Sequence, residues 1–513
     1  MFSKVFSGAL KGIEGSLVQV EADVGNGLPG FQLVGYLTSE VKEAQDRVRT
    51  AVKNSGYRLP AMKVTVNISP ANVRKQGTAF DLPIAVAVMA SYGQIADLGL
   101  LGTSAFIGEL GLDGSIKPVI GTLCLAEAFR EAGLARCFLP VQNQQEGLAI
   151  EGIDIIPVER LSDVVSMLNG MEAVIPACRL PEDEEKPHSA YSGDYRDVNG
   201  QKLLKRATEI AVAGHHNILY IGPAGSGKSM VARRIPTIMP PLSAGERLEV
   251  SKIYSVCGML PRGKALLLER PFRSPHHTIS PQALTGGGKV PRPGEISLAS
   301  RGVLFLDEFP EFQRRTIEVL RQPLEERSIT ISRAQGTCEF PADFMLAAAM
   351  NPCPCGFFPD RSRCSCQETQ IRRYLGKISR PLLDRIDICA EAAPVSYQEV
   401  RGEQDNESSE DIRRRVEAAW QLQKERFWGT ELCFNSEMGG KEIRRYCRLE
   451  KEEDRFLQEI YQKLGLSARG CQRILKVSRT IADLDGKEQI GRNHLAEAAG
   501  YRGLEEKYWG REA

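Results

Sequence analysis

Two hydrophobic patterns alternate along the first third of the chain. Apolar and polar side chains largely alternate at residues 17–22 and 62–68, as in strands that bury one face. Apolar side chains recur at helical spacing in residues 39–55, 81–91 and 121–132. This mixture predicts a separate α/β domain at residues 1–175.

The pattern changes twice further along the chain. Residues 176–197 are polar, acidic and marked by proline, which predicts a linker. Residues 198–394 contain short continuous apolar runs, typical of buried parallel strands, and predict a second α/β domain. Residues 395–513 predict a helical domain, with a cap signal at Ser408 and helices at 409–427, 451–464, 468–484 and 492–500.

A phosphate-binding pattern follows the apolar run 217–221. The segment fits G-x-x-x-x-G-K-[ST] and consists of Gly222, Pro223, Ala224, Gly225, Ser226, Gly227, Lys228 and Ser229. Glycines in such a loop let backbone N–H groups turn towards a phosphate, and the following helix adds its partial positive charge. We expect that helix to start at Lys228.

A second apolar run, residues 303–306, ends in two carboxylates. Lys228 is expected to reach the β- and γ-phosphates of a nucleoside triphosphate, while the Ser229 hydroxyl and Asp307 hold Mg²⁺. Glu308 is placed to polarise the attacking water. The two segments together predict a site that binds and hydrolyses a nucleoside triphosphate.

Length and charge leave the partner open. The 513 residues suggest about three domains, and 66 basic residues balance 65 acidic ones. A nucleic-acid partner would therefore have to bind local basic patches. The N-terminus lacks a signal peptide and no run of 18 apolar residues occurs, so we expect a cytoplasmic protein without a membrane partner. Most of the 13 cysteines are expected to be reduced thiols.

Four cysteines form an exception to this pattern. Two C-x-C pairs, Cys353 with Cys355 and Cys364 with Cys366, lie in a loop at residues 353–366. Four thiols can satisfy the tetrahedral coordination that Zn²⁺ prefers, although C-x₂-C pairs are commoner. A structural zinc ion, free thiols and a redox switch are the alternatives.

For His276 and His277, a polar contact is favoured over a metal site, because adjacent side chains of an extended loop point opposite ways.

These motifs resemble those of AAA+ ATPases, together with Asn351 after the apolar residues 344–350 and Arg385 in Leu-Leu-Asp-Arg. Asp307 lies 79 residues after Lys228. This spacing is longer than a plain AAA+ module needs and resembles that of the AAA+ branch with an insertion in helix 2. Segments along nearly the whole chain resemble the ComM/YifB family of magnesium-chelatase-like ATPases. They are Phe-Arg-Ser-Pro-His-His-Thr at 272–278, Pro-Gly-Glu-Ile-Ser-Leu-Ala at 293–299, Leu-Asp-Glu-Phe-Pro-Glu at 306–311, Met-Asn-Pro-Cys-Pro-Cys-Gly at 350–356 and Leu-Leu-Asp-Arg-Ile-Asp at 382–387.

The resemblance implies further catalytic roles. Asn351 would position the attacking water as sensor 1, and Arg385 would act as the arginine finger in the neighbouring subunit's site. Arg469 would be sensor 2, at the start of a lid helix. Arg380 is the alternative finger and Arg473 the alternative sensor. A finger that acts on a neighbour requires a ring, and we expect a homohexamer.

The resemblance also implies a DNA motor that drives branch migration in natural transformation. Residues 251–300 carry seven Lys and Arg against two Glu, and Arg361–Arg385 carries the same balance. The first region faces the pore in rings of this branch, so Lys264, Arg273, Lys289 and Arg292 are the DNA candidates. The second patch could equally serve subunit interfaces and nucleotide. Single-stranded or branched DNA and recombination proteins are the expected partners.

Residues 75–135 resemble the Lon protease domain, of the ribosomal S5 domain 2-like fold. Ala79 stands where that family carries its nucleophilic serine, and Leu123 where it carries its lysine. A methyl group cannot attack a carbonyl, and Thr78 and Lys117 are off the required positions. We therefore expect a non-proteolytic scaffold or DNA-guiding collar.

For the whole chain, the alternative to a DNA motor is a chelatase- or MoxR-like remodeller of a protein partner.

Overall fold

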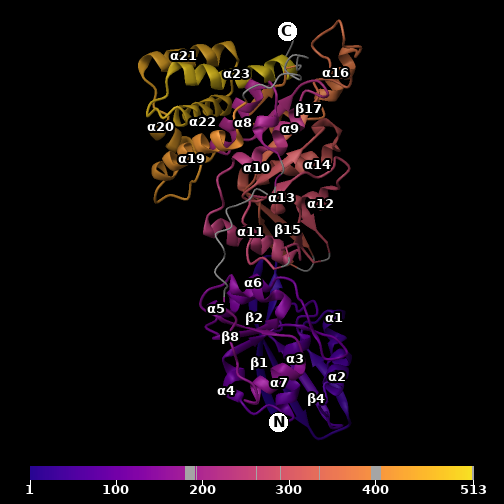
Figure 1. Cartoon of the computed structure of the whole chain (residues 1–513). Coiled ribbons are helices and arrows are strands. Elements are labelled where there is room, and N and C mark those ends of the chain that lie inside the picture. Colours follow the sequence, from indigo (N-terminus) through magenta and orange to yellow (C-terminus); the bar gives the residue numbers. More distant parts are fainter. Residues whose placement is uncertain are drawn as a thin grey trace. The chain divides into compact units, whose positions relative to one another are not determined.

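The computed structural model describes residues 1–178, 191, 193–261, 263–288, 290–333, 336–393 and 406–510. The chain divides into two compact units (Figure 1). The first comprises Met1–Lys186 and Ala244–Leu267, and the second comprises Pro187–Ser243 and Leu268–Ala513. A segment from the middle of the sequence, residues 244–267, thus belongs with the N-terminal residues.

The first unit is built on a seven-stranded mixed sheet in the order β3-β4-β2-β1-β5-β8-β9. The strands are β1 Phe2–Lys11, β2 Glu14–Gly25, β3 Gly30–Val34, β4 Lys63–Ser69, β5 Ser104–Phe106, β8 Arg136–Pro140 and β9 Asp154–Val158. A small hairpin pairs β6 Glu109–Leu110 with β7 Ile116–Lys117. The strands expected at residues 17–22 and 62–68 are confirmed as parts of β2 and β4.

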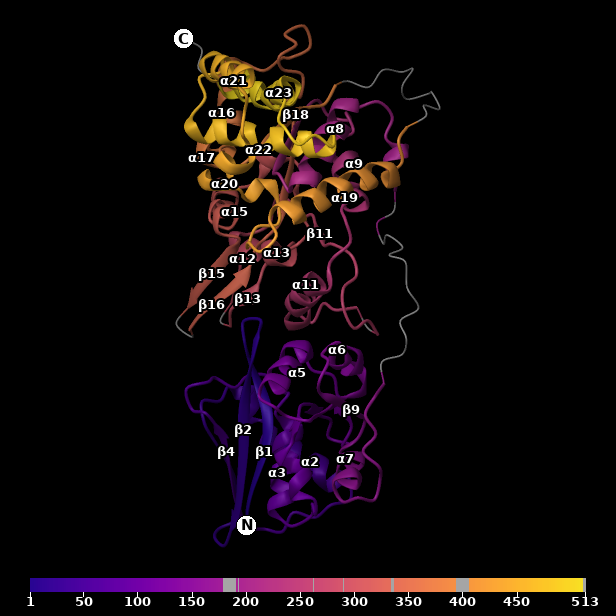
Figure 2. The same ribbon diagram turned by 90° about the vertical axis from the view of Figure 1, so that its left-hand side faces the viewer.

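Helices cover this sheet, and Figure 2 shows several of them to one side of β1 and β2. They are α1 Ser39–Lys42, α2 Ala44–Asn54, α3 Asp81–Ser91, α4 Leu98–Gly102, α5 Thr122–Glu131, α6 Gln144–Leu148, α7 Leu161–Leu168 and α11 Ala244–Val256. Every residue of α3 is buried, so this helix forms the centre of the core. The single helix expected at 39–55 is divided at Glu43.

The second unit contains a five-stranded parallel sheet in the order β11-β14-β17-β10-β18. Its strands are β11 Phe272–Arg273, β14 Val303–Leu306, β17 Met345–Met350, β10 Ile218–Ile221 and β18 Ile388–Glu391. The three central strands β14, β17 and β10 are buried along their whole length. That burial explains their continuous apolar runs, because both faces of a parallel sheet are covered.

Short helices and two hairpins surround this sheet. The helices are α8 Lys202–Gly214, α9 Lys228–Arg233, α10 Ile235–Ile238, α12 Pro281–Thr285, α13 Glu295–Leu298, α14 Arg314–Glu318, α15 Pro323–Glu326, α16 Glu368–Leu375 and α17 Arg380–Leu383. The hairpins pair β12 Gly286–Gly287 with β13 Arg292–Pro293, and β15 Ser328–Arg333 with β16 Gly336–Pro341.

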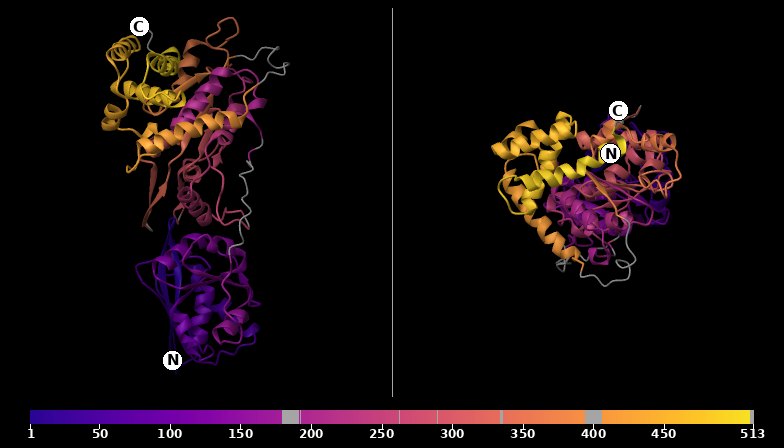
Figure 3. Two further views of the ribbon diagram at one scale, coloured as in Figure 1. Left: turned by 60° about the vertical axis from the view of Figure 1, so that its left-hand side comes forward. Right: turned by 90° about the horizontal axis from the view of Figure 1, so that it is seen from above.

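The C-terminal part of this unit is helical, as expected, and its orange-to-yellow helices lie together in Figure 3. They are α19 Ser409–Arg426, α20 Gly440–Tyr446, α21 Lys451–Lys463, α22 Ala468–Leu484 and α23 Arg492–Trp509. The Ser408 hydroxyl accepts from the Asp411 amide at 3.2 Å, which confirms the cap. α23 continues beyond Gly500 because Tyr501 and Tyr508 are buried on its inner side.

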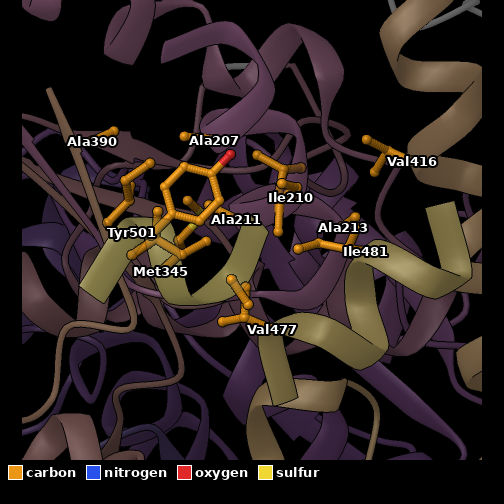
Figure 4. Close-up of a cluster of buried hydrophobic side chains, with 14 of the residues drawn as sticks. Ala207, Ile210, Ala211, Ala213, Met345, Ala390, Val416, Val477, Ile481 and Tyr501 are labelled. Atoms are coloured by element: carbon orange, nitrogen blue, oxygen red, sulfur yellow. The ribbon is translucent and has the colours of Figure 1, made fainter. Parts of the chain in front are cut away.

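One hydrophobic core joins these helices to the sheet. Figure 4 shows Ile210 of α8 in the same cluster as Val416 of α19, Val477 of α22 and Tyr501 of α23. The α8 helix therefore supports the helical lid on one side and the sheet on the other. No helix within the described ranges is both long and apolar enough to cross a bilayer.

Candidate nucleotide-binding site

The phosphate-binding loop lies at the carboxyl end of β10, the central strand that precedes it. Gly225 and Gly227 adopt φ values of 74° and 83°, in the left-handed region that favours glycine. A Cβ on Gly222 would lie 2.6 Å from the Ala392 Cβ, so the loop begins where two strand ends meet closely. Helix α9 starts at Lys228, as the sequence predicts.

The Lys228 ammonium is folded back onto its own loop. Its Nζ donates to the carbonyl oxygens of Gly222 and Pro223, each at 2.7 Å, and to the Asn351 Oδ1 at 3.3 Å. Burial lowers the pKa of Lys228 to about 8, although nearby Asp307 opposes that shift. The side chain is thus a buried cation with neutral partners, which suits it to an incoming phosphate.

The Ser229 and Asp307 side chains meet between the loop and β14. The Ser229 Oγ donates to the Asp307 Oδ2 at 2.7 Å, and the Asp307 Oδ1 accepts from the Glu308 amide at 2.9 Å. A hydroxyl beside a carboxylate is the oxygen donor set that holds Mg²⁺ in nucleotide sites. The residues present therefore fit a Mg²⁺–nucleotide complex.

Glu308 lies at the end of β14 with a left-handed backbone, φ 52°. Its side chain is 62% exposed, and its Oε2 lies 3.2 Å from the Nδ1 of His277. The rings of His276 and His277 have centroids 4.1 Å apart, so the expectation that these adjacent side chains point opposite ways is wrong. The second histidine of the pair thus contacts the carboxylate expected to activate water, a role the sequence did not suggest.

Two arginines meet at a different carboxylate. The Arg385 Nη2 lies 2.6 Å from the Glu325 Oε2, and the Arg469 Nη1 lies 3.4 Å from the Glu325 Oε1. These arginines hold the pKa of Glu325 below its usual value, chiefly through the Arg385 hydrogen bond. All three side chains line a polar cavity of about 230 Å³.

This cavity lies at the edge of the sheet opposite the phosphate loop. The Arg385 carbonyl accepts from the Asn217 Nδ2 at 2.9 Å, and Asn217 precedes β10 whereas Gly222 follows it. At about 3.3 Å per residue, about 16 Å of extended chain separates those two positions. Within the described residues, neither guanidinium has a hydrogen bond or ion pair with its own phosphate loop.

The two alternative arginines differ in their surroundings. Arg473 is buried, and its guanidinium donates to the Ile386 carbonyl at 3.1 Å and the Asp384 Oδ1 at 3.1 Å. These partners give Arg473 a structural role beneath α17. Arg380 is exposed at the start of α17.

The candidate DNA residues are dispersed. Arg273 forms a bidentate ion pair with Glu295 at 2.7 Å, so contact with phosphate would require this pair to open. Lys264 is exposed in the first unit, and Arg292 is exposed on β13 of the second. Lys289 lies outside the described residues, as does most of the linker predicted at 176–197.

The two hairpins of the second unit lie against each other and add a basic residue. A Cβ on Gly286 would lie 3.0 Å from the Ile331 Cδ1, and one on Gly287 would lie 3.4 Å from the Arg333 Nη2. Gly287 pairs with Arg292 across the first hairpin. Arg333 and Arg292, both exposed, thus flank Gly287.

The four cysteines of the 353–366 loop come together as well. Their Sγ atoms all lie within 4.8 Å of one another, an arrangement that could hold a metal ion.

In the first unit, the Ala79 carbonyl accepts a backbone hydrogen bond from Gly108, and Leu123 is fully buried in the core. The Thr78 hydroxyl donates to Glu109, and exposed Lys117 pairs with Glu109 across the β6–β7 hairpin.

Sequence reasoning did not assign Glu325 or Arg333, and it gave His277 only a general polar role. Glu325 lies in a short segment with a second glutamate beside it, and Arg333 is a single basic residue in a strand. Neither carries a motif, so only their neighbours in the fold identify them.

Comparison with known families covers most of the chain. The family described as "Magnesium chelatase, subunit ChlI" matches residues 194–400. "Subunit ChlI of Mg-chelatase" matches residues 20–143, and "Magnesium chelatase, subunit ChlI C-terminal" matches residues 406–502. The match over 194–400 includes the phosphate loop, Asp307 and Arg385.

Full-length relatives agree with this. The chain is 42% identical to Competence protein ComM of Haemophilus influenzae, over 98% of this chain and 97% of that protein. It is 40% identical to the uncharacterized protein YifB of Escherichia coli, with the same coverage. A Lon protease of Mycolicibacterium smegmatis is 25% identical over 31% of this chain and 21% of the protease, and the N-terminal region is the part related to Lon.

Proposed function

Because the chain belongs to the ComM/YifB family of magnesium-chelatase-like ATPases, we propose that it is an ATP-driven motor that moves on DNA as a ring and promotes branch migration. The observation that carries the ring is the separation of the two halves of the site. The phosphate loop lies at the carboxyl end of β10, and the Arg385–Arg469 pair lies on the side of its amino end.

Within one subunit, the residues divide the chemistry between them. Lys228 would turn from its carbonyl partners to the phosphates, and Ser229 and Asp307 would hold a Mg²⁺ ion, which would neutralise charge there. Glu308 takes a proton from the attacking water, which Asn351 orients beside Lys228. ATP and Mg²⁺ are thus the nucleotide and the metal of this site.

The remaining positive charge comes from the next subunit. The Arg385 backbone contacts Asn217 before β10, and Arg469 shares its Glu325 partner, whereas the phosphate loop follows β10 after about 16 Å of strand. A head-to-tail interface would bring one subunit's arginines to the next subunit's γ-phosphate, and such interfaces close into rings. Arginine fingers increase turnover by about 10³–10⁵ in related engines. We propose a hexamer that acts in the cytoplasm.

Mixing two inactive variants tests this arrangement. Lys228→Ala lacks nucleotide binding but keeps its arginines, whereas Arg385→Ala keeps its phosphate loop. In an equimolar mixture that assembles at random, about a quarter of interfaces combine an intact loop with an intact finger, so about a quarter of wild-type turnover should return. A mixture as inactive as its components would contradict action on the neighbour. Arg380→Ala, at the alternative finger position five residues before Arg385, is the matched comparison and should keep its own turnover.

DNA enters the proposal through the family and through the two hairpins. Exposed Arg292 and Arg333 flank Gly287, and backbone phosphates are recognised by such local cations without base-specific contacts. Turnover of ATP should rise with single-stranded and forked DNA at low salt, and less so at high salt. Unchanged turnover together with no retention on DNA at low salt would contradict the DNA proposal and favour remodelling of a protein partner.

A further inference from the structure

A cluster of four thiols lies beside the nucleotide site and has no role in the chemistry described so far. Cys353 follows Asn351 by two residues, and Cys355, Cys364 and Cys366 complete the set. The Sγ of Cys353 lies 3.3 Å from that of Cys355 and 3.8 Å from that of Cys364. The Sγ atoms of Cys355 and Cys364 are 3.5 Å apart. All four cysteines are free thiols.

These separations match the geometry of a tetrahedral metal site. A Zn–S distance of about 2.3 Å places the sulfurs of a ZnS₄ tetrahedron about 3.8 Å apart. A disulfide would require about 2.05 Å between two of the sulfurs. The Phe358 amide donates to the Cys353 Sγ at 3.4 Å, as backbone N–H groups do towards thiolates that carry charge. Cys353 itself is fully buried.

The loop that carries the thiols is long and lacks helices and strands of its own. β17 ends at Met350 and α16 begins at Glu368, which leaves residues 351–367 between them. Unbraced loops of this length are uncommon inside a compact unit. Its contacts include Phe358 against Tyr508, with ring centroids 6.1 Å apart, and the Arg361 guanidinium over the Phe358 ring. A metal cross-link would supply the missing constraint.

The same loop touches the phosphate-binding loop. Gly356, at φ 85°, lies between the two C-x-C pairs, and its amide donates to the Cys353 carbonyl at 3.0 Å. A Cβ built on Gly356 would lie 3.6 Å from the Ala224 nitrogen and 3.9 Å from the Pro223 Cα. The thiol cluster is therefore one residue away from a backbone contact with the loop that receives the phosphates.

We propose that Cys353, Cys355, Cys364 and Cys366 bind one Zn²⁺ ion, which braces the phosphate loop through Gly356 and holds Asn351 in place. Each thiol releases its proton to solvent as its Zn–S bond forms, and no electron is transferred. The ion is structural, because four sulfurs fill its coordination sphere and leave no position for water. This inference concerns the folded subunit and does not depend on DNA or on ring assembly.

Metal analysis of the purified full-length protein tests the site. We expect one zinc per chain, retained through gel filtration, and loss of that zinc in Cys355→Ser and in Cys364→Ser. Cys178→Ser, which removes an exposed thiol elsewhere, should keep it. Metal-free protein with all four thiols reactive, a disulfide among them, or iron in place of zinc would each overturn the proposal.

A second measurement covers the case in which the serine variants do not fold. An organomercurial added to the native wild-type protein should release one zinc as the four cluster thiols react, whereas reaction of the exposed Cys178 should release none. Zinc release should weaken binding of a non-hydrolysable ATP analogue at least fivefold, while zinc added back with reductant restores it. Affinity that is unchanged after zinc release would overturn the coupling to the phosphate loop. Because the readouts are metal content and nucleotide affinity, a failed DNA-stimulation assay leaves both results interpretable.

Discussion

Lys228 and its neighbours illustrate how the fold changes the chemistry of single residues. The ammonium lies among carbonyl oxygens and an amide oxygen, and burial lowers its pKa to about 8. A cation in such surroundings has lost its hydration without gaining a full counter-charge. Phosphate oxygens would supply that counter-charge, so the free site is prepared for an anion.

The lowered pKa predicts how nucleotide affinity depends on pH. Below about pH 8 the Lys228 ammonium already carries its charge, whereas above it binding must first take up a proton. Affinity for a non-hydrolysable ATP analogue should therefore fall between about pH 7.5 and 9.5, approaching tenfold per pH unit. Calorimetry in two buffers of different ionisation enthalpy should detect proton uptake at the higher pH. An equally strong, pH-independent affinity would contradict the role of Lys228.

Glu308 and Glu311 offer a matched pair for testing catalysis. Glu308→Gln removes the base but keeps the shape, so ATP binding should stay within about twofold while turnover falls by about 10²-fold or more. Glu311 lies three residues on, and its Oε2 lies 3.4 Å from the Lys377 Nζ. Glu311→Gln should leave turnover near the wild-type value. Single-turnover hydrolysis separates the two steps, and full activity in Glu308→Gln would remove Glu308 from its role.

At the scale of elements, α11 shows that sequence order and packing order differ. This helix lies between two segments of the second unit in sequence but packs on α5 of the first. The Gly121 amide donates to the Ser255 carbonyl at 3.1 Å, and the Ser255 hydroxyl donates to the Glu146 Oε2 at 2.8 Å. Leu248 and Leu266 pack against the hydrophobic cluster around α5. The first unit is therefore complete only with residues 244–267.

An ion pair between these two helices allows a direct test. Lys252 of α11 pairs with Glu127 of α5, and each side chain is only 20% exposed. Lys252→Glu would place two carboxylates in contact and destabilise the packing by on the order of 1 kcal/mol. Hydrogen exchange in α5 should speed up in that variant and slow again when Glu127→Lys is added. Failure of the double variant to recover would indicate that the pair does not hold the helices together.

At the scale of the whole molecule, the second unit carries a phosphate loop at one end of its parallel strands and an arginine cluster at the other end. The phosphate loop follows the carboxyl end of β10, and Arg385 lies beside its amino end. In the proposed ring, such a subunit would complete its site only with a copy of itself.

The paired hairpins predict the salt dependence of DNA binding. Arg292→Ala and Arg333→Ala should each weaken binding to single-stranded DNA at low salt and reduce the slope of log affinity against log salt by about 1. Arg444→Ala, an exposed arginine on α20, is the control and should leave the slope unchanged. Fluorescence anisotropy at several salt concentrations measures these slopes. Identical slopes in all three variants would exclude the hairpins from the DNA contact.

Much of this architecture could be predicted from local patterns. The strands β10, β14 and β17, the start of α9 and the extent of α22 follow from apolar runs and caps that depend only on neighbouring residues. The phosphate loop is likewise local, because its glycines and Lys228 lie within eight positions. Two boundaries were missed: the division of the helix at Glu43, and the extension of α23 beyond Gly500, which depends on the burial of Tyr501 and Tyr508.

The sequence alone was therefore sufficient to predict the family, the fold of the two α/β parts and the helical part, and the nucleotide loop. Each of these is specified by short motifs or by the spacing of hydrophobic residues. Long-range contacts came only with the folded chain: Glu325 beneath both arginines, His277 against Glu308, α11 on α5, and Gly356 against Ala224. No short-range pattern encodes these pairs, because their members are separated in sequence and are brought together only when the sheet and its core assemble. The same assembly carries Arg385 to the amino end of β10, and that position is the basis for proposing a site shared between neighbouring subunits.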